Sequence, residues 1–392
     1  MIRTSSAFTS EIDDVEEAVA DILGQLPPKD RLLSHTVGLI GATPEFVESG
    51  VVEALQEALP FDLVGQTTIA AASPGSSSLE ILNLLLITSD ETEFVIGQTD
   101  PILSEDADII ARSYRAAAGE RPDAPALVLI YAPLLLNVGG DFLVNSFDEV
   151  SGQVPLFGTL AVDNTIDYHK SRVICRGEAS ADQLAFVAFY GDVKPQFLLA
   201  TISHESVFEE KGVVTSSDGN QLREVDGKPA VEFLKSKGLV TDENGVIKGV
   251  NSFPYIVDFN DGNPPVIRII FATTPEGYAV CLGDVPEGST LSVGHFSEEE
   301  IQATTRAQLA SLAAGGGEGW HGMLACSCIG RYLMMQLDPD GEANAAHGIV
   351  DPLGIPYALV YSGGEICPVT NLKDGLSLTN RFHNATFVAV IF

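Results

Sequence analysis

The chain has 392 residues, 45% of them hydrophobic, and its 54 acidic and 21 basic side chains give a formal net charge of -33. At roughly 150 residues per domain, such a chain can bury a core and divide into two or three domains. A surface this negative repels phosphate backbones and anionic lipids. This excludes binding of nucleic acids or of a membrane surface through a basic patch.

The N-terminal end reads MIRTSSAFTSEIDDVEEAVADIL, without a basic region followed by an apolar run, so we expect no signal peptide. The longest apolar stretch, 124–138, contains two prolines and is too short to span a bilayer. Five cysteines lack the spacing of a secreted disulfide framework. We therefore expect a cytoplasmic protein with reduced thiols.

Helical patterns flank the first half of the chain. The first helix is predicted to begin at Ser10 as its N-cap, to carry an apolar stripe, and to end at Gly24. A second helix is predicted over 105–118, where Gly119 ends it. The Val/Ile/Leu-rich runs between these helices are typical of strands.

An internal repeat is the more informative pattern. Segments 36–89, 124–192 and 320–392 each contain an apolar strand, a helical stretch, a proline, a second strand that opens into a glycine-containing turn, and a last, very apolar strand. The last strands are apolar on both faces, which predicts central positions in sheets covered on both sides.

The segment after the second copy has its own local pattern. Residues 218–220 (Asp-Gly-Asn) predict a hairpin turn, and a helix over 229–237 follows with proline at its start. A further helix is expected after Ser297, which is spaced to form a capping box with Glu300, and the glycines at 315–317 are expected to end it.

The polar stretch SHESVFEEKG marks the expected domain boundary near residue 205, which gives domains 1–205 and 206–392. The predicted fold is mixed α/β. It has two domains of mixed β-sheets with helices on their outer faces, built from the repeated strand–helix–strand unit. An αββα layering is compatible with this pattern.

Several segments resemble one known family. QLREVDGKPAVEFL, GDVPEGSTL, LACSCIGR, and the ending VYSGGEICPV with NRFHNATFVAVIF stand in the same order as in the FIST family of F-box and intracellular signal transduction proteins. The resemblance extends over nearly the whole chain, with an N-terminal half over 30–205 and a C-terminal half over 206–392.

This resemblance implies a sensory module that binds small molecules, such as amino acids or their metabolites. Bacterial members often stand beside chemoreceptor, histidine kinase or cyclic-dinucleotide output domains, and some bind haem and sense nitric oxide. The chain has no room for such an output module, so we expect the signal to pass to a separate partner, such as a histidine kinase or a chemoreceptor.

The motifs of common enzymes are missing, and we predict no catalytic residues and no enzyme. No Gly-x-Ser-x-Gly elbow is present. The glycine run at 315–319 lacks the Lys-Ser/Thr tail of a phosphate loop and is expected to be a flexible connector. The run 338–342 (Asp-Pro-Asp-Gly-Glu) lacks the distal glutamate of a calcium loop and is expected to be a solvated turn.

Cysteines and histidines leave two alternatives for a metal. Cys326 and Cys328 would share one face of a strand, and with Cys367 and His383 they could form a thiolate–imidazole site. Because Cys-x-Cys is not the usual spacing of metal ligands, we favour the interpretation that these cysteines are small, buried hydrophobic residues. We expect no cofactor; haem, held by a histidine or a cysteine in an apolar pocket, remains the alternative.

Polar residues at strand ends beside glycines are the candidates for ligand binding, because ligand pockets are mainly apolar with a few placed polar groups. The candidate ligand-binding residues are Cys326, Arg331, Tyr361, Gly364, Glu365, Asn380, His383 and Asn384. Arg331 could bind a carboxylate and Glu365 an ammonium group, which suits an amino acid. The alternative is an internal Arg331–Glu365 ion pair. By the repeat, Thr67, Thr68, Thr159 and Asp163 would line the opposite wall.

Overall fold

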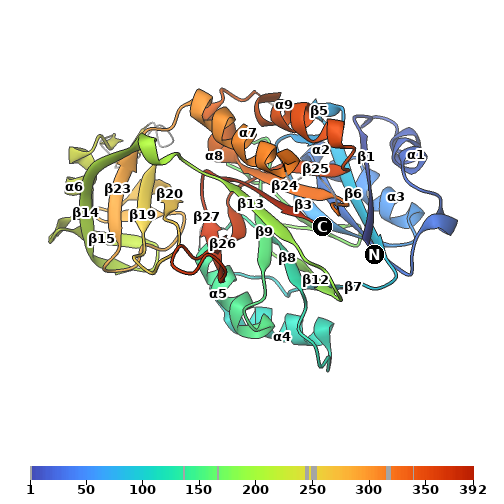
Figure 1. Ribbon diagram of the computed structural model, residues 1–392, viewed down its shortest axis with the longest axis horizontal. Coiled ribbons are helices and arrows are strands. Elements are labelled where there is room, and N and C mark those ends of the chain that lie inside the picture. Colours follow the sequence, from blue (N-terminus) through green and yellow to red (C-terminus); the bar gives the residue numbers. More distant parts are fainter. Residues whose placement is uncertain are drawn as a thin grey trace.

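A computed structural model describes residues 2–135, 137–165, 167–242, 247–248, 254–314, 319–338 and 340–392. In these ranges the chain forms three six-stranded sheets, each mixed parallel and antiparallel, and a β unit with one eight-stranded and one two-stranded sheet (Figure 1). Helices lie on the outside of the three sheets. The fold is therefore mixed α/β, as predicted.

Each of the three sheets is built around one copy of the repeat. The first repeat contains β1 (Ile2–Thr9), α1 (Val15–Gln25), β2 (His35–Ala42), α2 (Pro44–Glu48), α3 (Val51–Ala58), β3 (Asp62–Thr67), β4 (Ala71–Ser73), β5 (Ser76–Ser78) and β6 (Leu82–Ser89). The second contains β7 (Glu93–Gln98), α4 (Ala107–Ala118), β8 (Leu127–Pro133), α5 (Gly140–Ser151), β9 (Leu156–Ala161), β10 (Val173–Cys175), β11 (Glu178–Ser180) and β12 (Ala185–Tyr190). The third contains β13 (Gln196–Ala200), α7 (Glu298–Ala314), β24 (Met323–Cys328), α8 (Ile329–Met334), α9 (Asp340–Ile349), β25 (Tyr357–Ser362), β26 (Glu365–Thr370), β27 (Leu378–His383) and β28 (Phe387–Ile391).

The third repeat is interrupted after β13 by an inserted β unit. This unit contains β14 (Val207–Asp218), β15 (Gln221–Val225), β16 (Lys228–Pro229), α6 (Ala230–Ser236), β17 (Val240–Thr241), β18 (Ile247–Lys248), β19 (Tyr255–Asp258), β20 (Val266–Arg268), β21 (Ile270–Thr273), β22 (Ala279–Cys281) and β23 (Thr290–Gly294). Its strands run in the order β20-β19-β23-β14-β15-β22-β21. In Figure 1 it lies at the end of the molecule away from α1. The predicted boundary near 205 falls just before it and stays a prediction.

The three repeats exchange their hairpins in a cycle. The hairpin β4–β5 of the first repeat pairs with β25 of the third, β10–β11 of the second pairs with β3 of the first, and β26–β27 of the third pairs with β9 of the second. Inside each sheet, the two strands joined by a helix are parallel: β2 with β3, β8 with β9, and β24 with β25. Each sheet is therefore completed by a neighbouring repeat.

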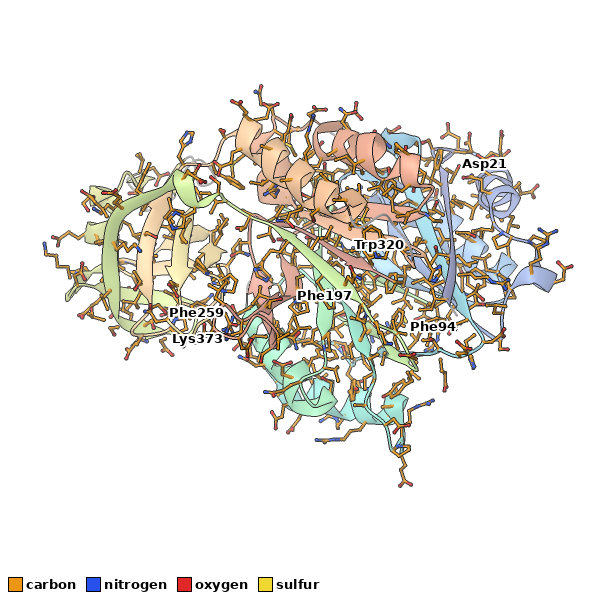
Figure 2. All side chains as sticks on the ribbon, viewed as in Figure 1. Asp21, Phe94, Phe197, Phe259, Trp320 and Lys373 are labelled. Carbon is orange, nitrogen blue, oxygen red and sulfur yellow. The ribbon has the colours of Figure 1, made fainter. Side chains whose placement is uncertain are left out.

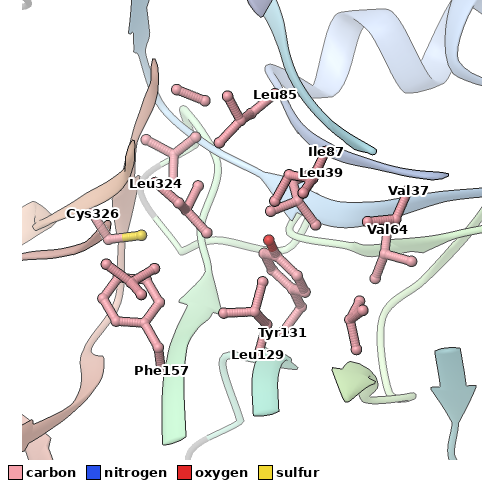
Figure 3. Close-up of a cluster of buried hydrophobic side chains, with 14 of the residues drawn as sticks. Val37, Leu39, Val64, Leu85, Ile87, Leu129, Tyr131, Phe157, Leu324 and Cys326 are labelled. Atoms are coloured by element: carbon pink, nitrogen blue, oxygen red, sulfur yellow. The ribbon is translucent and has the colours of Figure 1, made fainter. Parts of the chain in front are cut away.

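The last strand of each repeat, β6, β12 or β28, is an interior strand with a neighbour on either side, although it stands second from the edge of its sheet and not at the predicted centre. In β6, Leu85 and Ile87 face the core shared by the three sheets, whereas Leu84 and Leu86 face the helices of the first repeat. Side chains alternate along a strand, so a strand covered on both faces is apolar throughout. Figure 3 shows the shared core, where side chains of all three sheets meet. The three sheets surround this core, and helices pack on the outer face of each.

Local predictions were partly right. The helix over 105–118 is α4, which ends at Gly119 with φ of 64°. The first helix begins later than predicted, because the Asp14 side chain, not Ser10, accepts hydrogen bonds from the first turn. Gly24 lies within that helix and does not end it.

In the inserted β unit, the predicted hairpin turn joins β14 to β15, and the predicted helix is α6. The capping box at α7 is only half formed. The Ser297 hydroxyl accepts a hydrogen bond from the Glu300 N–H, but the Glu300 carboxylate bonds to the N–H of Ser203 instead. The predicted helix end at 315–317 and the glycine connector up to residue 318 lie outside the described residues. Among the described residues, no helix is long and apolar enough to cross a membrane.

Candidate ligand site at the strand ends

The second parallel strands of the repeats are linked to one another where they end. The N–H of Val162 donates to the carbonyl of Thr67 at 3.3 Å, and the N–H of Gly363 donates to the carbonyl of Leu160 at 2.8 Å. The Thr68 hydroxyl closes the cycle by donating to the carbonyl of Tyr361 at 3.0 Å. Each bond joins a different pair of repeats, because each strand continues into a hairpin that belongs to another sheet. The strand ends therefore form one shared region.

The Glu365 carboxyl is the chemically distinctive group of this region. Its side chain is fully buried at the start of β26. The Ser362 hydroxyl lies 2.5 Å from one oxygen, and the Thr386 hydroxyl lies 2.8 Å from the other. Burial raises the pKa of Glu365 to about 8, against the lowering effect of these hydrogen bonds. At neutral pH the carboxyl is therefore mostly protonated, so a raised pKa marks it as a candidate functional group.

Two other predicted residues, His383 and Cys326, share the surroundings of Glu365. His383 is its partner in the β26–β27 ladder, and its Nε2 lies 3.0 Å from the carbonyl of Cys367. Burial lowers the pKa of His383 to about 3, so the ring is neutral. Cys326 belongs to the shared core, where burial raises the pKa of its thiol well above its usual value. These groups act as buried core residues that carry no charge at neutral pH.

Metal binding by the predicted thiolate–imidazole set gains no support. Cys326, Cys328 and Cys367 are buried and free, and the pKa of each thiol is raised by burial, which opposes thiolate formation. Within the described ranges, no group of three or more His, Cys, Asp or Glu side chains is placed to hold a metal ion. The haem alternative stays a prediction.

Arg331 forms an ion pair, but Glu342 is its carboxylate partner, not Glu365. The Arg331 Nη2 lies 2.9 Å from the Glu342 carboxylate, and both side chains are fully buried. Thr305 and Ser327 donate their hydroxyls to the same carboxylate. The alternative of an Arg331–Glu365 pair was therefore wrong. The solvated turn predicted at 338–342 is right only in part. Asp338 and Asp340 are exposed, but α9 begins at Asp340, and Gly341 and Glu342 are buried; residue 339 lies outside the described residues.

The remaining candidate ligand-binding residues, which are Asn380, Asn384, Tyr361 and Gly364, each have contacts of their own. Asn380 accepts from the Leu156 N–H at 2.9 Å and donates to the Val154 carbonyl at 2.8 Å, so it fastens β27 to the start of β9. Asn384 donates to the carbonyl of the preceding residue at 3.1 Å. The Tyr361 ring packs against Tyr332 with centroids 4.8 Å apart. A side chain at Gly364 would meet the Phe382 ring, with 2.4 Å between a Cβ and the nearest ring carbon.

The four residues predicted for the opposite wall do lie at the strand ends. Thr67 and Thr68 make the inter-repeat contacts above, and the Thr159 hydroxyl donates to Gln66. Asp163 is fully buried, and its Oδ2 has no hydrogen-bond partner in the described part of the chain. These threonines hold the repeats together.

A small, partly open pocket lies beside this region, at the junction between the inserted β unit and the three repeats. It lies next to the predicted turn, since Gly363, between Ser362 and Gly364, is part of its wall. Its lining residues are Leu134, Leu135, Val138, Gly139, Gly140, Leu160, Asn220, Phe271, Cys281, Leu282, Gly363 and Phe382. Its cavity volume, counted as the space that admits the centre of a water molecule, is about 20 Å³. We call it the junction pocket.

The junction is held by a second buried ion pair, which sequence reasoning missed. Arg268 of β20 lies 3.1 Å from the Asp141 carboxylate at the start of α5. Its other nitrogens donate to the carbonyls of Asp284 and Phe382 at 2.9 and 3.0 Å. Phe259 and Lys373 mark the same side of the junction in Figure 2. A lone arginine inside the apolar run PPVIRIIFA was the available indication.

The fold and the pocket define a class: a three-repeat α/β protein with an inserted β unit and a small apolar pocket where this unit meets the repeats. Residues 36–228 match the FIST N domain and residues 230–368 match the FIST C domain, so the chain belongs to the FIST family. FIST domains are sensor domains of signal transduction. The resemblance seen in the sequence is confirmed.

Comparison with solved structures gives remote likenesses. Cyanuric acid hydrolase from A. caulinodans is 13% identical with a TM-score of 0.34, and 100% of this chain and 99% of that chain are covered. A second cyanuric acid hydrolase structure is 10% identical with a TM-score of 0.37, and the match covers 100% of this chain and 98% of that chain. Phosphoribosylformylglycinamidine synthase II from Thermotoga maritima is 12% identical with a TM-score of 0.20, and the match covers 100% of this chain and 71% of that chain. No curated protein matches the chain.

Proposed function

We propose that this protein is a non-enzymatic sensor that binds a small, mainly apolar molecule in the junction pocket. The observation that carries the proposal is the position of this pocket. It lies at the ends of parallel strands and between two structural units, which are the usual places for ligand sites in α/β proteins. Its lining is apolar apart from Asn220 and backbone groups.

The pocket is connected to the buried polar groups by a short turn. Gly363 lines the pocket, and Ser362 and Glu365 on either side of the glycine pair bond to each other through their side chains. A ligand that presses on this turn would change the surroundings of a buried, mostly protonated carboxyl. This gives a physical route from ligand binding to a change in the core of the protein.

The predicted recognition of an amino acid through Arg331 and Glu365 needs revision. Arg331 is fully used by Glu342, Thr305 and backbone carbonyls, so it has little capacity left for a ligand carboxylate. We therefore include amino acids with apolar side chains in the ligand class, but we assign their recognition to the junction pocket. The charge on Arg331 takes no part in it.

A panel of metabolites that includes amino acids, scored by thermal unfolding and confirmed by calorimetry, tests the proposal. A ligand present at 100 times its Kd stabilises the folded state by about 2.7 kcal/mol. Val138→Phe adds a ring to the pocket wall and should abolish this gain. Val47→Phe, the same change at an open surface hollow beside α3, is the matched control and should retain it. If Val138→Phe binds as tightly as the control, the proposal is wrong.

We further propose that the sensor acts through a separate signalling partner, such as a histidine kinase or a chemoreceptor, and that it works in the cytoplasm. Five free, buried cysteines support a reducing location. Cell fractionation tests the location. Co-purification with a kinase or chemoreceptor encoded by a neighbouring gene, with and without the ligand, tests the partner. If the amount of partner recovered is the same in both cases, the proposal is contradicted.

A further inference from the structure

The three exchanged hairpins end in the edge strands β5, β11 and β27. Ser77, Ala179 and Phe382 are equivalent positions of these strands, because each stands opposite a residue that pairs with the same place in the neighbouring sheet. In an antiparallel pair, alternate residues direct their N–H and C=O groups away from the partner strand. Two-residue turns close the first two hairpins, and in the third the Asn371 N–H donates to the Ser377 carbonyl. This phase points the backbone N–H and C=O of all three positions outward.

The chain covers two of these positions with its own segments. The Ser77 hydroxyl donates to Asp340 at the start of α9, which lies next to β5 in Figure 1. The outward carbonyl of Phe382 accepts from the Arg268 guanidinium of the inserted β unit at 3.0 Å. The Phe382 ring packs at the start of α5 and leaves no room for a Cβ at Gly140. In the third repeat, a cation and an apolar ring therefore occupy this place.

Ala179 is the position that the chain leaves uncovered. It carries a methyl group where the third repeat has the Phe382 ring, and an open groove with a cavity volume of about 560 Å³ lies between α3 and β11. Val47, Val52 and Ala179 form the apolar wall of this groove and belong to the hydrophobic layer under the helices of the first repeat. Within the described part of the chain, no strand pairs with the outer side of β11. We call this site the α3–β11 groove.

The rim of the α3–β11 groove is negative. Glu53 and Glu57 of α3 and Glu178 of β11 are exposed on it. Arg176 is the one cation among the lining side chains, and its Nε lies 2.8 Å from the Asp62 carboxylate, which offsets its charge. The three carboxylates are left to attract a cationic partner and to repel an acidic one.

We propose that the α3–β11 groove binds an extended, basic segment of a partner protein, which adds a strand to β11. In such strand addition, main-chain hydrogen bonds hold the segment and alternate side chains enter the groove. A donor of the segment bonds to the Ala179 carbonyl, as Arg268 does at Phe382, and an apolar side chain rests on Val47 and Val52. Basic side chains meet the rim carboxylates. The inference rests on the proposed function in one respect, that the protein acts through a separate partner, and it names the surface and the chemistry of that contact.

Fluorescence polarisation with labelled peptides tests the groove. The probes are short peptides in which arginine alternates with valine, leucine or phenylalanine, and peptides with glutamate in place of arginine are the controls. We expect at least one arginine peptide to bind and no glutamate peptide to do so. Hydrogen exchange of the wild-type protein, which needs no variant to fold, should slow over 178–181 when that peptide is bound. If no arginine peptide binds, or if protection appears only elsewhere, the proposal is wrong.

Matched variants test the edge and the rim. Ala179→Pro removes an N–H that faces outward and leaves the ladder to β10 intact, so it should fold and lose the peptide, whereas Ala179→Ser should bind it. Glu57→Lys combined with Glu178→Lys should weaken binding about tenfold. Glu120→Lys combined with Glu149→Lys, the same change of charge at exposed positions outside the groove, should bind as wild type.

The groove is refuted if Ala179→Pro, shown by circular dichroism to be folded, binds the peptide as wild type does. Equal weakening by both lysine pairs would also refute it, because it would indicate general attraction to an acidic protein. Analytical ultracentrifugation distinguishes another occupant. A wild-type dimer that Ala179→Pro dissociates would assign β11 to a second copy of the chain and overturn the basic segment.

The peptide assay uses no metabolite, so it can fail independently of the proposed ligand site. Val47→Phe fills the α3–β11 groove and should lose the peptide but keep the metabolite. Val138→Phe in the junction pocket should do the reverse. A protein that binds the peptide but no metabolite would leave this inference standing and remove the proposed ligand site.

Discussion

The buried Arg331–Glu342 pair makes the strongest prediction about stability. Both side chains are fully buried, and the Glu342 carboxylate receives hydrogen bonds from the guanidinium and from the hydroxyls of Thr305 and Ser327. Glu342→Gln keeps the shape and one acceptor oxygen, but it leaves the Arg331 charge without a counter-charge. Removal of one partner of a buried pair costs about 3–5 kcal/mol. We expect about 3 kcal/mol for this near-isosteric change.

Urea unfolding followed by circular dichroism gives the free energies. Glu57→Gln, the same change at an exposed position of α3, should stay within about 0.5 kcal/mol of wild type. The double variant Arg331→Met with Glu342→Leu replaces both charges by apolar groups of similar size, so it should recover more than half of the loss. The double variant separates the cost of an unpaired charge from the cost of altered packing.

The reasoning is refuted if Glu342→Gln lowers the free energy of unfolding by less than about 1 kcal/mol, because an uncompensated, fully buried charge destabilises the folded state by more than that. It is also refuted if the double variant is less stable than the single one. The same series decides the role of Arg331 in binding. If a ligand found in the metabolite panel still binds the double variant, Arg331 is a structural residue.

Two further predictions concern Glu365 and Asn380. Because burial raises the pKa of Glu365 to about 8, the folded state holds a proton that the unfolded chain has released, so its stabilising contribution is lost as the pH rises through 8. Between pH 7 and pH 8, where His383 is mostly neutral in the unfolded chain as well, the free energy of unfolding should fall by about 1 kcal/mol. Glu365→Gln should abolish this fall, and equal pH slopes in the two proteins would contradict the assignment. Asn380→Ala should lower the free energy of unfolding in urea by about 2 kcal/mol, because it leaves the buried Leu156 N–H without an acceptor. The same variant should bind the ligand with unchanged affinity, and a weaker affinity would place Asn380 in the site.

The repeat and its interior strands could be predicted because they depend on short-range patterns. In the segments that became β12 and β28, and over 84–87 of β6, every residue is apolar, and only a strand covered on both faces tolerates that pattern. Helix ends were less reliable. Gly24 and Ser10 have the right chemistry for a stop and a cap, yet Asp14 was better placed to cap and Gly24 costs little inside a helix held by its buried face.

The candidate ligand-binding residues stay a prediction, but the contacts of one of them could not be read from the sequence, for a physical reason. Glycines beside polar residues located the turn at 363–365, which does border the pocket. The sequence could not show that Arg331 pairs with Glu342, because the two residues belong to different helices and meet only after α8 and α9 pack beside α7. Arg268 and Asp141 are 127 positions apart, so no local pattern connects them.

By itself, the sequence determined the mixed α/β class, the threefold repetition and the family, because hydrophobic period, turn residues and ordered motifs are local properties of the chain. The tertiary structure alone decided how the repeats exchange hairpins, where the inserted β unit sits, and which charges pair. These features depend on contacts between distant segments, and many partners satisfy the same local chemistry. Their choice is fixed only when the sheets close around a common core and leave each buried charge with one reachable partner.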